Sequence, residues 1–350
     1  MTSQALASSA LEAAGFAPDL EEKFAAGLRS GLLSNVHVLL VARAGKMVME
    51  YYSTGHDEAW GRDLGQVRFG PDVLHDLRSV SKSITSLLYG IALDRGRVPP
   101  PEASLLAQFP QYQDLATDPV RAKLTIGHAL TMTMGNAWDE SLPYTDPRNS
   151  EIAMELAPDR LRYVLEQKML RDPGVKWTYS GGAVALIGAI IARGTGMKLE
   201  DFARDALFTP LGIDSFEWAR GDDGIASAAS GLRLRPRDLL RIGHLTLAGG
   251  QFQGLQIVSR AWIDASTHPA IATGDGLEYG RFWFLGNAAT PAQPGPARWF
   301  AGFGNGGQRL WLMPQTDLAV VSLSGAYNQP DSWITPNRIF REIVLANLRR

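Results

Sequence analysis

Ser79-Val80-Ser81-Lys82-Ser83-Ile84-Thr85-Ser86 opens a stretch in which apolar residues recur at helical spacing as far as Asp94. It contains the one Ser-x-x-Lys of the chain, and a helix places this serine and lysine one turn apart on the same face. The amide groups of the first helical turn point toward whatever Ser79 binds. A serine nucleophile needs a base, and burial with nearby positive charge would lower the pKa of Lys82 until it is a neutral base. The alternative is a serine that caps the helix, followed by a solvated lysine.

Composition limits the classes of protein that the chain can belong to. Its 350 residues are 45% hydrophobic, enough for a core larger than that of one typical domain. A net charge of −2 gives no electrostatic footprint for nucleic acid or an anionic membrane, and no run reaches the ~18 apolar residues of a membrane span. The absence of cysteine excludes disulfides, thiolate catalysis and cysteine metal sites. Residues 1–22 are acidic, without the apolar segment of a secretory signal, so we expect a cytoplasmic protein.

Apolar, β-rich runs at both ends of the chain enclose a middle of helices and loops. The predicted strands are residues 36–41, 47–52, 282–285, 308–313 and 318–323. The predicted helices are residues 17–31, 79–94, 124–132, 157–168, 181–193, 201–207, 237–248, 261–266 and 333–348. Residues 53–72 are polar and glycine-containing, without a predicted element. This order predicts an α/β (α+β) fold in which both ends build one antiparallel sheet flanked by helices.

Further motifs follow the Ser-x-x-Lys in a fixed order. They are Leu130-Thr131-Met132-Thr133-Met134-Gly135, Trp177-Thr178-Tyr179-Ser180-Gly181, Leu207-Phe208-Thr209-Pro210-Leu211-Gly212-Ile213, Ser230-Gly231-Leu232 with Arg237-Asp238-Leu239, and Gly306-Gly307-Gln308 with the strand to Pro314. Over residues 30–345 this ordered set resembles the β-lactamase-related serine hydrolases. That family includes class C β-lactamases, D-alanyl carboxypeptidases, family VIII esterases and 6-aminohexanoate-dimer hydrolases.

The resemblance implies a β-lactamase/transpeptidase-like fold with two domains. Residues 1–75 and 205–350 would form the sheet domain, residues 76–204 an inserted all-helical domain, and the active site would lie between them.

The same resemblance implies Ser79 as nucleophile, Lys82 as its base and Tyr179 as proton relay, with Ser180 beside it. The asparagine that the family carries after Tyr-Ser is Gly181 in this chain. Loss of that amide favours esters or small amides over penicillins as substrates. The alternative for Tyr179 is a cap on the helix over residues 181–193, with its ring in the core.

The run Gly302-Phe303-Gly304-Asn305-Gly306-Gly307 fits the G-x-G-x-x-G of dinucleotide sites. That interpretation requires a strand before the run and a helix after it, whereas a β-rich run follows here, near the C-terminus. The resemblance instead implies a strand at Gly302-Phe303-Gly304, with the Asn305 N–H completing an oxyanion hole with the N–H of Ser79, within one or two residues of register. The cationic or imidazole side chain of the family strand is missing. The alternative is a glycine-rich turn between strands.

Other candidates are less specific. Asp139, Glu140 and Tyr144, in the loop after Met134, either line the site or are ordinary loop residues. Trp283 resembles an aromatic residue near the family's pocket, or belongs to the core. The six histidines show no paired spacing, so we expect neither a metal nor another cofactor. No Gly-x-Ser-x-Gly elbow supports an α/β-hydrolase.

The sequence therefore predicts a serine hydrolase that cleaves an ester or amide bond of a small molecule through an acyl-enzyme at Ser79. The alternatives are a D-amino-acid peptidase or carboxypeptidase, a weak β-lactamase, and a ligand-binding module of the same fold with little turnover. The physiological substrate and the oligomeric state are left open.

Overall fold

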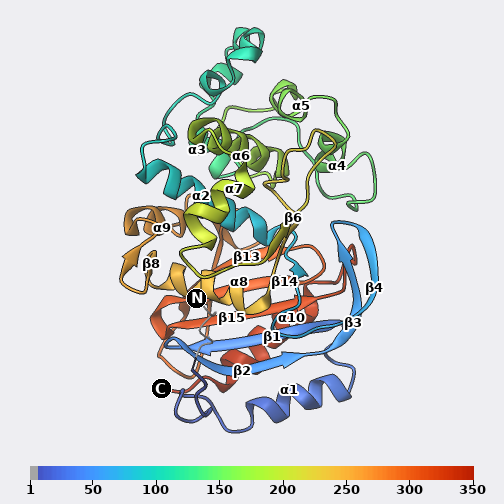
Figure 1. Ribbon diagram of the computed structural model, residues 1–350, viewed down its shortest axis with the longest axis vertical. Helices are drawn as coiled ribbons and strands as arrows, with labels where there is room; N and C mark the ends of the chain where they lie inside the picture. The colour runs from blue at the N-terminus through green and yellow to red at the C-terminus, as the bar shows by residue number, and fades with distance from the viewer. Residues whose placement is uncertain (1–6) are drawn as a thin grey trace.

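The computed structural model describes residues 7–350, and its centre is an eight-stranded antiparallel sheet in the order β10-β11-β12-β13-β14-β15-β1-β2 (Figure 1). The strands are β1 (Val36–Arg43), β2 (Lys46–Tyr52), β10 (Ile271–Ala272), β11 (Glu278–Tyr279), β12 (Phe284–Ala288), β13 (Ala297–Gly304), β14 (Gln308–Met313) and β15 (Leu318–Ser324). β15 pairs with β1, with Leu40 opposite Val321. The two ends of the chain thus share one sheet, which confirms the predicted fold class.

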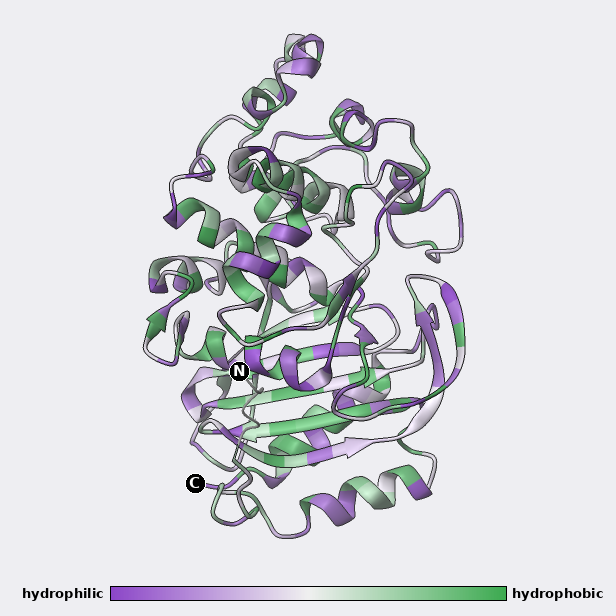
Figure 2. Cartoon of the chain, viewed as in Figure 1, coloured by the Kyte–Doolittle hydropathy of each residue, from purple (hydrophilic) through white to green (hydrophobic). Residues whose placement is uncertain are grey.

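Both faces of this sheet are covered, which explains why its central strands are apolar at nearly every position. Side chains alternate across β1: Val38 and Leu40 pack into the core on one face, and Leu39 and Val41 into the core on the other. The first face carries α8 (Pro236–Leu247) and α2 (Val80–Asp94), and the second carries α1 (Leu20–Arg29), α10 (Ile334–Arg338) and η6 (Ile339–Leu345). Figure 2 shows the hydrophobic residues concentrated along the central strands.

The helices between residues 80 and 208 gather on one side of the sheet (Figure 1). Besides α2 they are η1 (Leu106–Gln108), η2 (Pro110–Thr117), η3 (Arg121–Lys123), α3 (Ile126–Leu130), α4 (Ser150–Glu155), α5 (Arg160–Glu166), α6 (Gly181–Thr195), α7 (Leu199–Ala203) and η4 (Arg204–Phe208). One apolar core runs from the sheet through α2 to α6. The division into a sheet domain of residues 1–75 and 205–350 and a helical domain of residues 76–204 stays a prediction. Within the described chain, the length and hydropathy of a membrane span are met only by a pair of helices bent by 74°, α6 with residues 199–208.

The remaining elements are short. They are β3 (Thr54–Ala59), β4 (Arg62–Arg68), β5 (His75–Asp76), β6 (Phe216–Trp218), β7 (Leu232–Leu234), β8 (Gln251–Phe252), β9 (Leu255–Gln256), α9 (Arg260–Ser266) and η5 (Pro314–Thr316).

Two elements that bear on the site were not predicted. Residues 54–68 form the hairpin β3–β4, which is rich in polar residues and so lacked the apolar alternation that identifies a strand (Figures 1 and 2). Residues 150–155 form the short helix α4, which begins where the Asn149 side chain accepts a hydrogen bond from the Glu151 amide. A helix this short carries no periodic apolar face.

Candidate active site

Ser79 stands at a tight turn between β5 and α2. Arg78, the residue before it, has a φ of 46°, in the left-handed region that an arginine seldom adopts. The Asp76 carboxylate supports this conformation by accepting the Arg78 amide at 2.8 Å. Ser79 itself is the N-cap of α2 and is only 8% exposed. The turn therefore presents the serine hydroxyl at the amino end of a buried helix.

Lys82 lies one helical turn after Ser79, and the structure brings the two together as predicted. The Lys82 ammonium donates a hydrogen bond of 2.9 Å to Ser79 Oγ and another of 2.9 Å to the Ala229 carbonyl. Its side chain is 2% exposed, which rules out the solvated lysine of the alternative interpretation. Ala229 precedes the Ser230-Gly231-Leu232 motif, and the sequence had not identified it as part of the site.

Tyr179 completes the group. Its ring centroid is 4.9 Å from Lys82 Nζ, and its hydroxyl interacts with both Lys82 and Ser79. Burial raises the pKa of Tyr179 above its ordinary value, against the opposing effect of Lys82, so the residue is a neutral phenol at pH 7. A neutral phenol can accept one proton while it releases another, which is what a relay requires.

Aromatic rings form a wall beside Tyr179. Phe284 stacks on Tyr179 with ring centroids 6.2 Å apart, and Phe303 stacks on Phe284 at 4.7 Å. Trp177 and Tyr279 pack against the same Phe284 at 6.1 and 4.9 Å. Four of these five rings are partly exposed and Tyr279 is buried. The surface next to the nucleophile is therefore apolar and suits an uncharged acyl or leaving group.

The expected protonation state of Lys82 is wrong. Burial by itself lowers the pKa of Lys82, but Glu151, Tyr179 and Glu140 together raise it above its ordinary value. The Glu151 carboxylate lies 3.6 Å from Lys82 Nζ. Lys82 is therefore an ammonium in the resting protein, and nearby negative charge replaces the positive charge that the sequence argument assumed.

Of the acidic pair after Met134, it is Glu140 rather than Asp139 that reaches the site. Glu140 accepts hydrogen bonds from the Gly181 amide at 2.6 Å, the Trp138 indole at 2.6 Å and the Tyr144 hydroxyl at 2.8 Å. Burial, reinforced by Glu151, raises the pKa of Glu140 to about 8, while Lys82 opposes the rise. Asp139 is exposed and accepts the Ser141 amide of its own turn, and its part in substrate binding stays a prediction.

The glycine-rich strand is present as β13, and its glycines serve helix packing. A Cβ on Gly302 would lie 3.0 Å from Ser83 Oγ, and one on Gly304 2.6 Å from the Leu77 carbonyl. Both glycines let β13 approach the start of α2 closely, whereas Phe303 faces the aromatic wall. The amide of Asn305 follows directly, next to this contact. Its role as an oxyanion donor stays a prediction.

Two residues predicted to line the substrate site have structural roles in the protein, and the part of Ser180 in substrate binding stays a prediction. The Ser180 hydroxyl accepts the Ala183 amide at 3.1 Å, so Ser180, and not Tyr179, caps α6. Trp283 is fully buried and packs edge-on against Phe300 at 5.5 Å, which makes it a core residue. The neighbouring Phe284 is the aromatic residue that reaches Tyr179.

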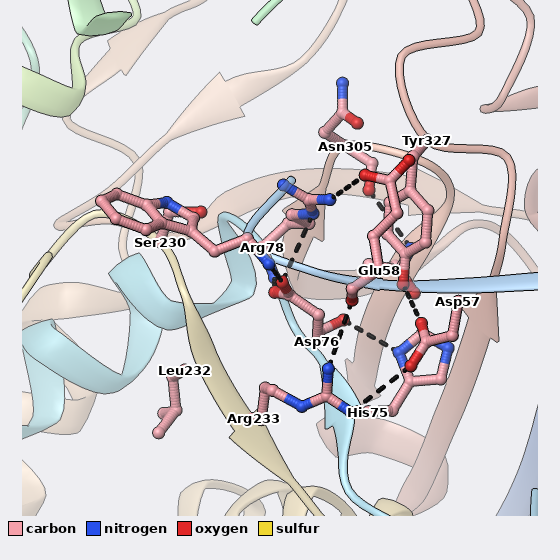
Figure 3. A network of polar contacts seen from close by, with 12 residues as sticks. Asp57, Glu58, His75, Asp76, Arg78, Ser230, Leu232, Arg233, Asn305 and Tyr327 are labelled. Carbon is pink, nitrogen blue, oxygen red and sulfur yellow. Dashed lines mark hydrogen bonds and ion pairs between the residues drawn. The ribbon is translucent and has the colours of Figure 1, made fainter. Parts of the chain in front are cut away.

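A buried polar network holds the turn before Ser79 from the other side (Figure 3). Arg78 pairs with Glu58 of β3 at 2.8 Å, and its guanidinium lies 4.5 Å from the centroid of the Tyr327 ring. The Tyr327 hydroxyl donates to Asp57 at 2.7 Å, and Arg233 lies 3.4 Å from the same carboxylate. The hairpin β3–β4 thus anchors the residue that precedes the nucleophile.

His37, Asp57 and His75 in this network have ligand atoms within 4.8 Å of one another, the spacing of a metal site. The two histidines bond to each other, and Asp57 already has Tyr327 and Arg233 as partners. His75 Nδ1 donates to the Asp76 carbonyl at 2.9 Å, so its Nε2 accepts from His37 Nδ1 at 3.0 Å. The guanidinium of Arg233 beside Asp57 opposes a further cation. The chemistry of the cluster therefore favours a structural network.

A cavity of about 810 Å³ lies away from this site. It is lined by α5, α6 and residues 223–228, and includes Glu155, Arg160 and Ser227 but none of Ser79, Lys82 and Tyr179. Ala228 borders it, one residue before the Ala229 that holds Lys82.

Comparison with known proteins agrees with this geometry. The sequence profile of the Beta-lactamase family matches residues 25–336. The 6-aminohexanoate-dimer hydrolase of Paenarthrobacter ureafaciens is 26% identical over 337 residues, covering 90% of this chain and 77% of that protein. A solved structure from Bacillus anthracis assigned as a 6-aminohexanoate-dimer hydrolase superposes with a TM-score of 0.72 at 18% identity, covering 96% of this chain and 86% of that one. The structure of EstCE1, a hydrolase with promiscuous acyltransferase activity, gives 0.71 at 17% identity, covering 92% and 97%. With this match over most of its length, the chain belongs to the beta-lactamase family.

Proposed function

We propose that the protein is a serine hydrolase that cleaves ester or amide bonds through an acyl-enzyme at Ser79. The observation that carries the proposal is the hydrogen bond from Lys82 to Ser79 at the buried start of α2, with the centroid of the Tyr179 ring 4.9 Å from Lys82 Nζ. A nucleophile, a cation and a proton relay within reach of one another are the parts that acyl transfer needs.

The direction of the Lys82 hydrogen bond decides the route of the proton. Because Lys82 donates to Ser79 Oγ, the hydroxyl hydrogen of Ser79 must point away from Lys82, and we assign Tyr179 as its acceptor. As Ser79 Oγ bonds to the substrate carbonyl carbon, its proton passes to the Tyr179 oxygen, and Tyr179 gives its own proton to the leaving oxygen or nitrogen. The carbonyl–leaving group bond then breaks, and the acyl group remains on Ser79.

The charges of the site fit this step. The Lys82 ammonium stabilises the negative charge that develops on Ser79, and we assign the amides of Ser79 and Asn305 to the carbonyl oxygen. Water then attacks the acyl-enzyme, and the proton returns to Ser79 through Tyr179 by the reverse path. The protons thus move between Ser79, Tyr179, the leaving group and the attacking water, and none is left over at the end of the cycle.

The surroundings favour substrates without a negative charge. The Glu151 carboxylate lies 3.6 Å from Lys82 Nζ, and the wall beside Tyr179 is aromatic. Arg309 donates to the carbonyls of Gly304 and Gln308, and Arg281 lies 4.9 Å from the centroid of the Trp262 ring, so each arginine is already engaged. Neither arginine therefore replaces the cation that is missing from the strand before Asn305 and that would bind the carboxylate of a β-lactam. The relative named for hydrolysing the 6-aminohexanoate dimer supports amides as a second substrate class.

The test compares kcat/KM for p-nitrophenyl butyrate, a linear p-nitroanilide amide and nitrocefin on one preparation. A cephalosporin and its methyl ester form a matched pair that isolates the carboxylate. A lost charge-assisted hydrogen bond is worth about 1.5–3 kcal/mol, so we expect the short ester to exceed nitrocefin by roughly 10–100-fold. We also expect the methyl ester to react faster than the free acid. A preference for nitrocefin and for the free acid would support the β-lactamase alternative.

The same experiment separates an enzyme from a binding module of this fold. An enzyme releases many equivalents of p-nitrophenol per protein chain, whereas a binding module stops after one equivalent or none. Continued turnover is the outcome that the proposal requires.

A further inference from the structure

Gly181 leaves a space that Glu151 fills. A Cβ built on Gly181 would lie 2.2 Å from Glu151 Oε2 and 2.5 Å from its carboxyl carbon. The backbone of Gly181 has no positive φ, so its conformation does not demand glycine. What position 181 requires is the absence of a side chain, because the Glu151 carboxylate occupies that volume.

The backbone around Glu151 holds it firmly. Asn149 is fully buried, and its side chain accepts the Glu151 amide at 2.9 Å and donates to the Leu142 carbonyl at 2.7 Å. Glu151 is 4% exposed. Ser150 and Asp139 exchange two further hydrogen bonds, which tie α4 to the loop that carries Glu140. The carboxylate therefore has little freedom to move away from the site.

Among residues 7–350, the strong interaction available to the Glu151 carboxylate oxygen Oε2 is the ion pair with Lys82. Glu151 Oε2 is buried, has no hydrogen-bond partner among residues 7–350 and lies 3.6 Å from Lys82 Nζ. Taking a carboxylate out of water without a partner is costly, and a nearby ammonium offsets that cost. Lys82 in turn is faced by Glu151 from α4, Glu140 from the preceding loop and Tyr179 from the turn before α6.

We propose that Glu151 is the positioning residue of Lys82, which it holds as an ammonium against the Ser79 hydroxyl from the space left by Gly181. The proposal rests on the proposed function, because positioning matters only if Lys82 assists Ser79. Glu151 itself touches neither Ser79 nor, in this role, the substrate. It acts by fixing the charge and direction of the Lys82 hydrogen bond.

The experiment compares Glu151→Gln, Glu151→Asp and the control Glu155→Gln, with p-nitrophenyl butyrate as substrate. Glu155 lies one turn further along α4 and pairs with Arg160 at 2.7 Å, so its variant disturbs the same helix without touching Lys82. We expect Glu151→Gln to lower kcat by roughly 10–100-fold with little change in KM, since an attractive charge at Lys82 is lost. We expect Glu151→Asp to recover part of the activity, and Glu155→Gln to keep kcat while its melting temperature falls.

The pH profile distinguishes positioning from a purely structural role. Without the carboxylate, Lys82 loses its proton more readily. Measured in a Glu140→Gln background, which removes the titration of Glu140, the high-pH limb of kcat should therefore move to lower pH by about one pH unit or more when Glu151→Gln is added. That limb should stay in place in Glu155→Gln.

A double-variant cycle tests the shared space. Gly181→Ala should lower kcat in the native background, because its methyl group displaces Glu151 from Lys82. The same substitution should cost little further activity in Glu151→Ala, where nothing occupies that volume.

Three results would each overturn the positioning role. The first is a native kcat and a native pH profile in Glu151→Gln. The others are a loss of kcat in Glu155→Gln equal to that in Glu151→Gln, and losses of kcat that are additive in the double-variant cycle. Failure of the proposed function has a different signature, because Ser79→Ala would then keep its activity.

Discussion

Lys82 Nζ lies 2.9 Å from Ser79 Oγ, and the hydrogen bond runs from the lysine to the serine. Lys82 carries the proton because Glu151, 3.6 Å away, favours the charged form. A lysine in this state cannot take a further proton from Ser79. It can stabilise the oxyanion that forms when the proton leaves toward Tyr179.

This arrangement predicts that charge alone at position 82 is insufficient. In Lys82→Arg the planar guanidinium keeps the charge but cannot occupy the point from which the ammonium reaches both Ser79 Oγ and the Ala229 carbonyl. We expect kcat for p-nitrophenyl butyrate to fall by about 100-fold or more, close to the loss in Lys82→Ala. Circular dichroism would establish that both variants fold. Near-native activity in the arginine variant would show that only the charge matters.

A second prediction concerns alkaline pH. The pKa of Glu140 is raised to about 8, first by burial and then by Glu151. As pH rises through 8, Glu140 ionises and adds a negative charge that acts on Tyr179, where it opposes release of the proton to the leaving group. We expect kcat/KM to fall there, and the fall to be absent in Glu140→Gln, which keeps an oxygen for the Gly181 amide. A profile in Glu140→Gln that still declines near pH 8 would assign the titration to another group.

A third prediction concerns stability in acid. Burial lowers the pKa of His75 to about 4 and that of His37 to about 3, from an ordinary value of 6.5. Between pH 6.5 and 4 the unfolded chain binds more protons than the folded one, so the free energy of unfolding decreases as pH falls. For His75 the loss is about 3 kcal/mol over this window.

Urea unfolding at pH 7, 6, 5 and 4 measures that loss. His75→Gln should be less stable than the native protein at pH 7, because its ring bridges His37 and the Asp76 carbonyl. Its stability should nevertheless change less between pH 6.5 and 4. If the free energy of unfolding changes equally with pH in the two proteins, His75 is not the group responsible for the loss of stability.

The sequence was sufficient for the parts of the fold whose apolar pattern is strong. The segments that form β1, β14, β15 and α2 are apolar because they are buried, so each could be predicted from its hydrophobic pattern. The pairing of the three strands in one sheet followed from that prediction. Ser79, Lys82 and Tyr179 were found because they stand in motifs of fixed order. In the structure Lys82 bonds to Ser79 and lies 4.9 Å from the centroid of the Tyr179 ring, and the catalytic roles of the three residues stay predictions.

The parts that escaped prediction depend on contacts between distant segments. Glu151 is 69 residues from Lys82 along the chain. It lies on a six-residue helix, which is too short to show the apolar periodicity by which a helix is predicted. Its only local signal is Asn149 two residues earlier, a residue type that caps helices. The sequence shows that position 181 has no side chain, but it does not show that Glu151 fills the space. The protonation state of Lys82 was predicted wrongly for the same reason.

Mass spectrometry after reaction with a fluorophosphonate shows whether Ser79 is the residue that forms the acyl-enzyme. We expect a single adduct, on the peptide that contains Ser79. We also expect that Ser79→Ala, which removes one oxygen and keeps the fold, shows neither the adduct nor hydrolysis of p-nitrophenyl butyrate. Labelling of a different residue, or full hydrolysis by a folded Ser79→Ala variant, would contradict it.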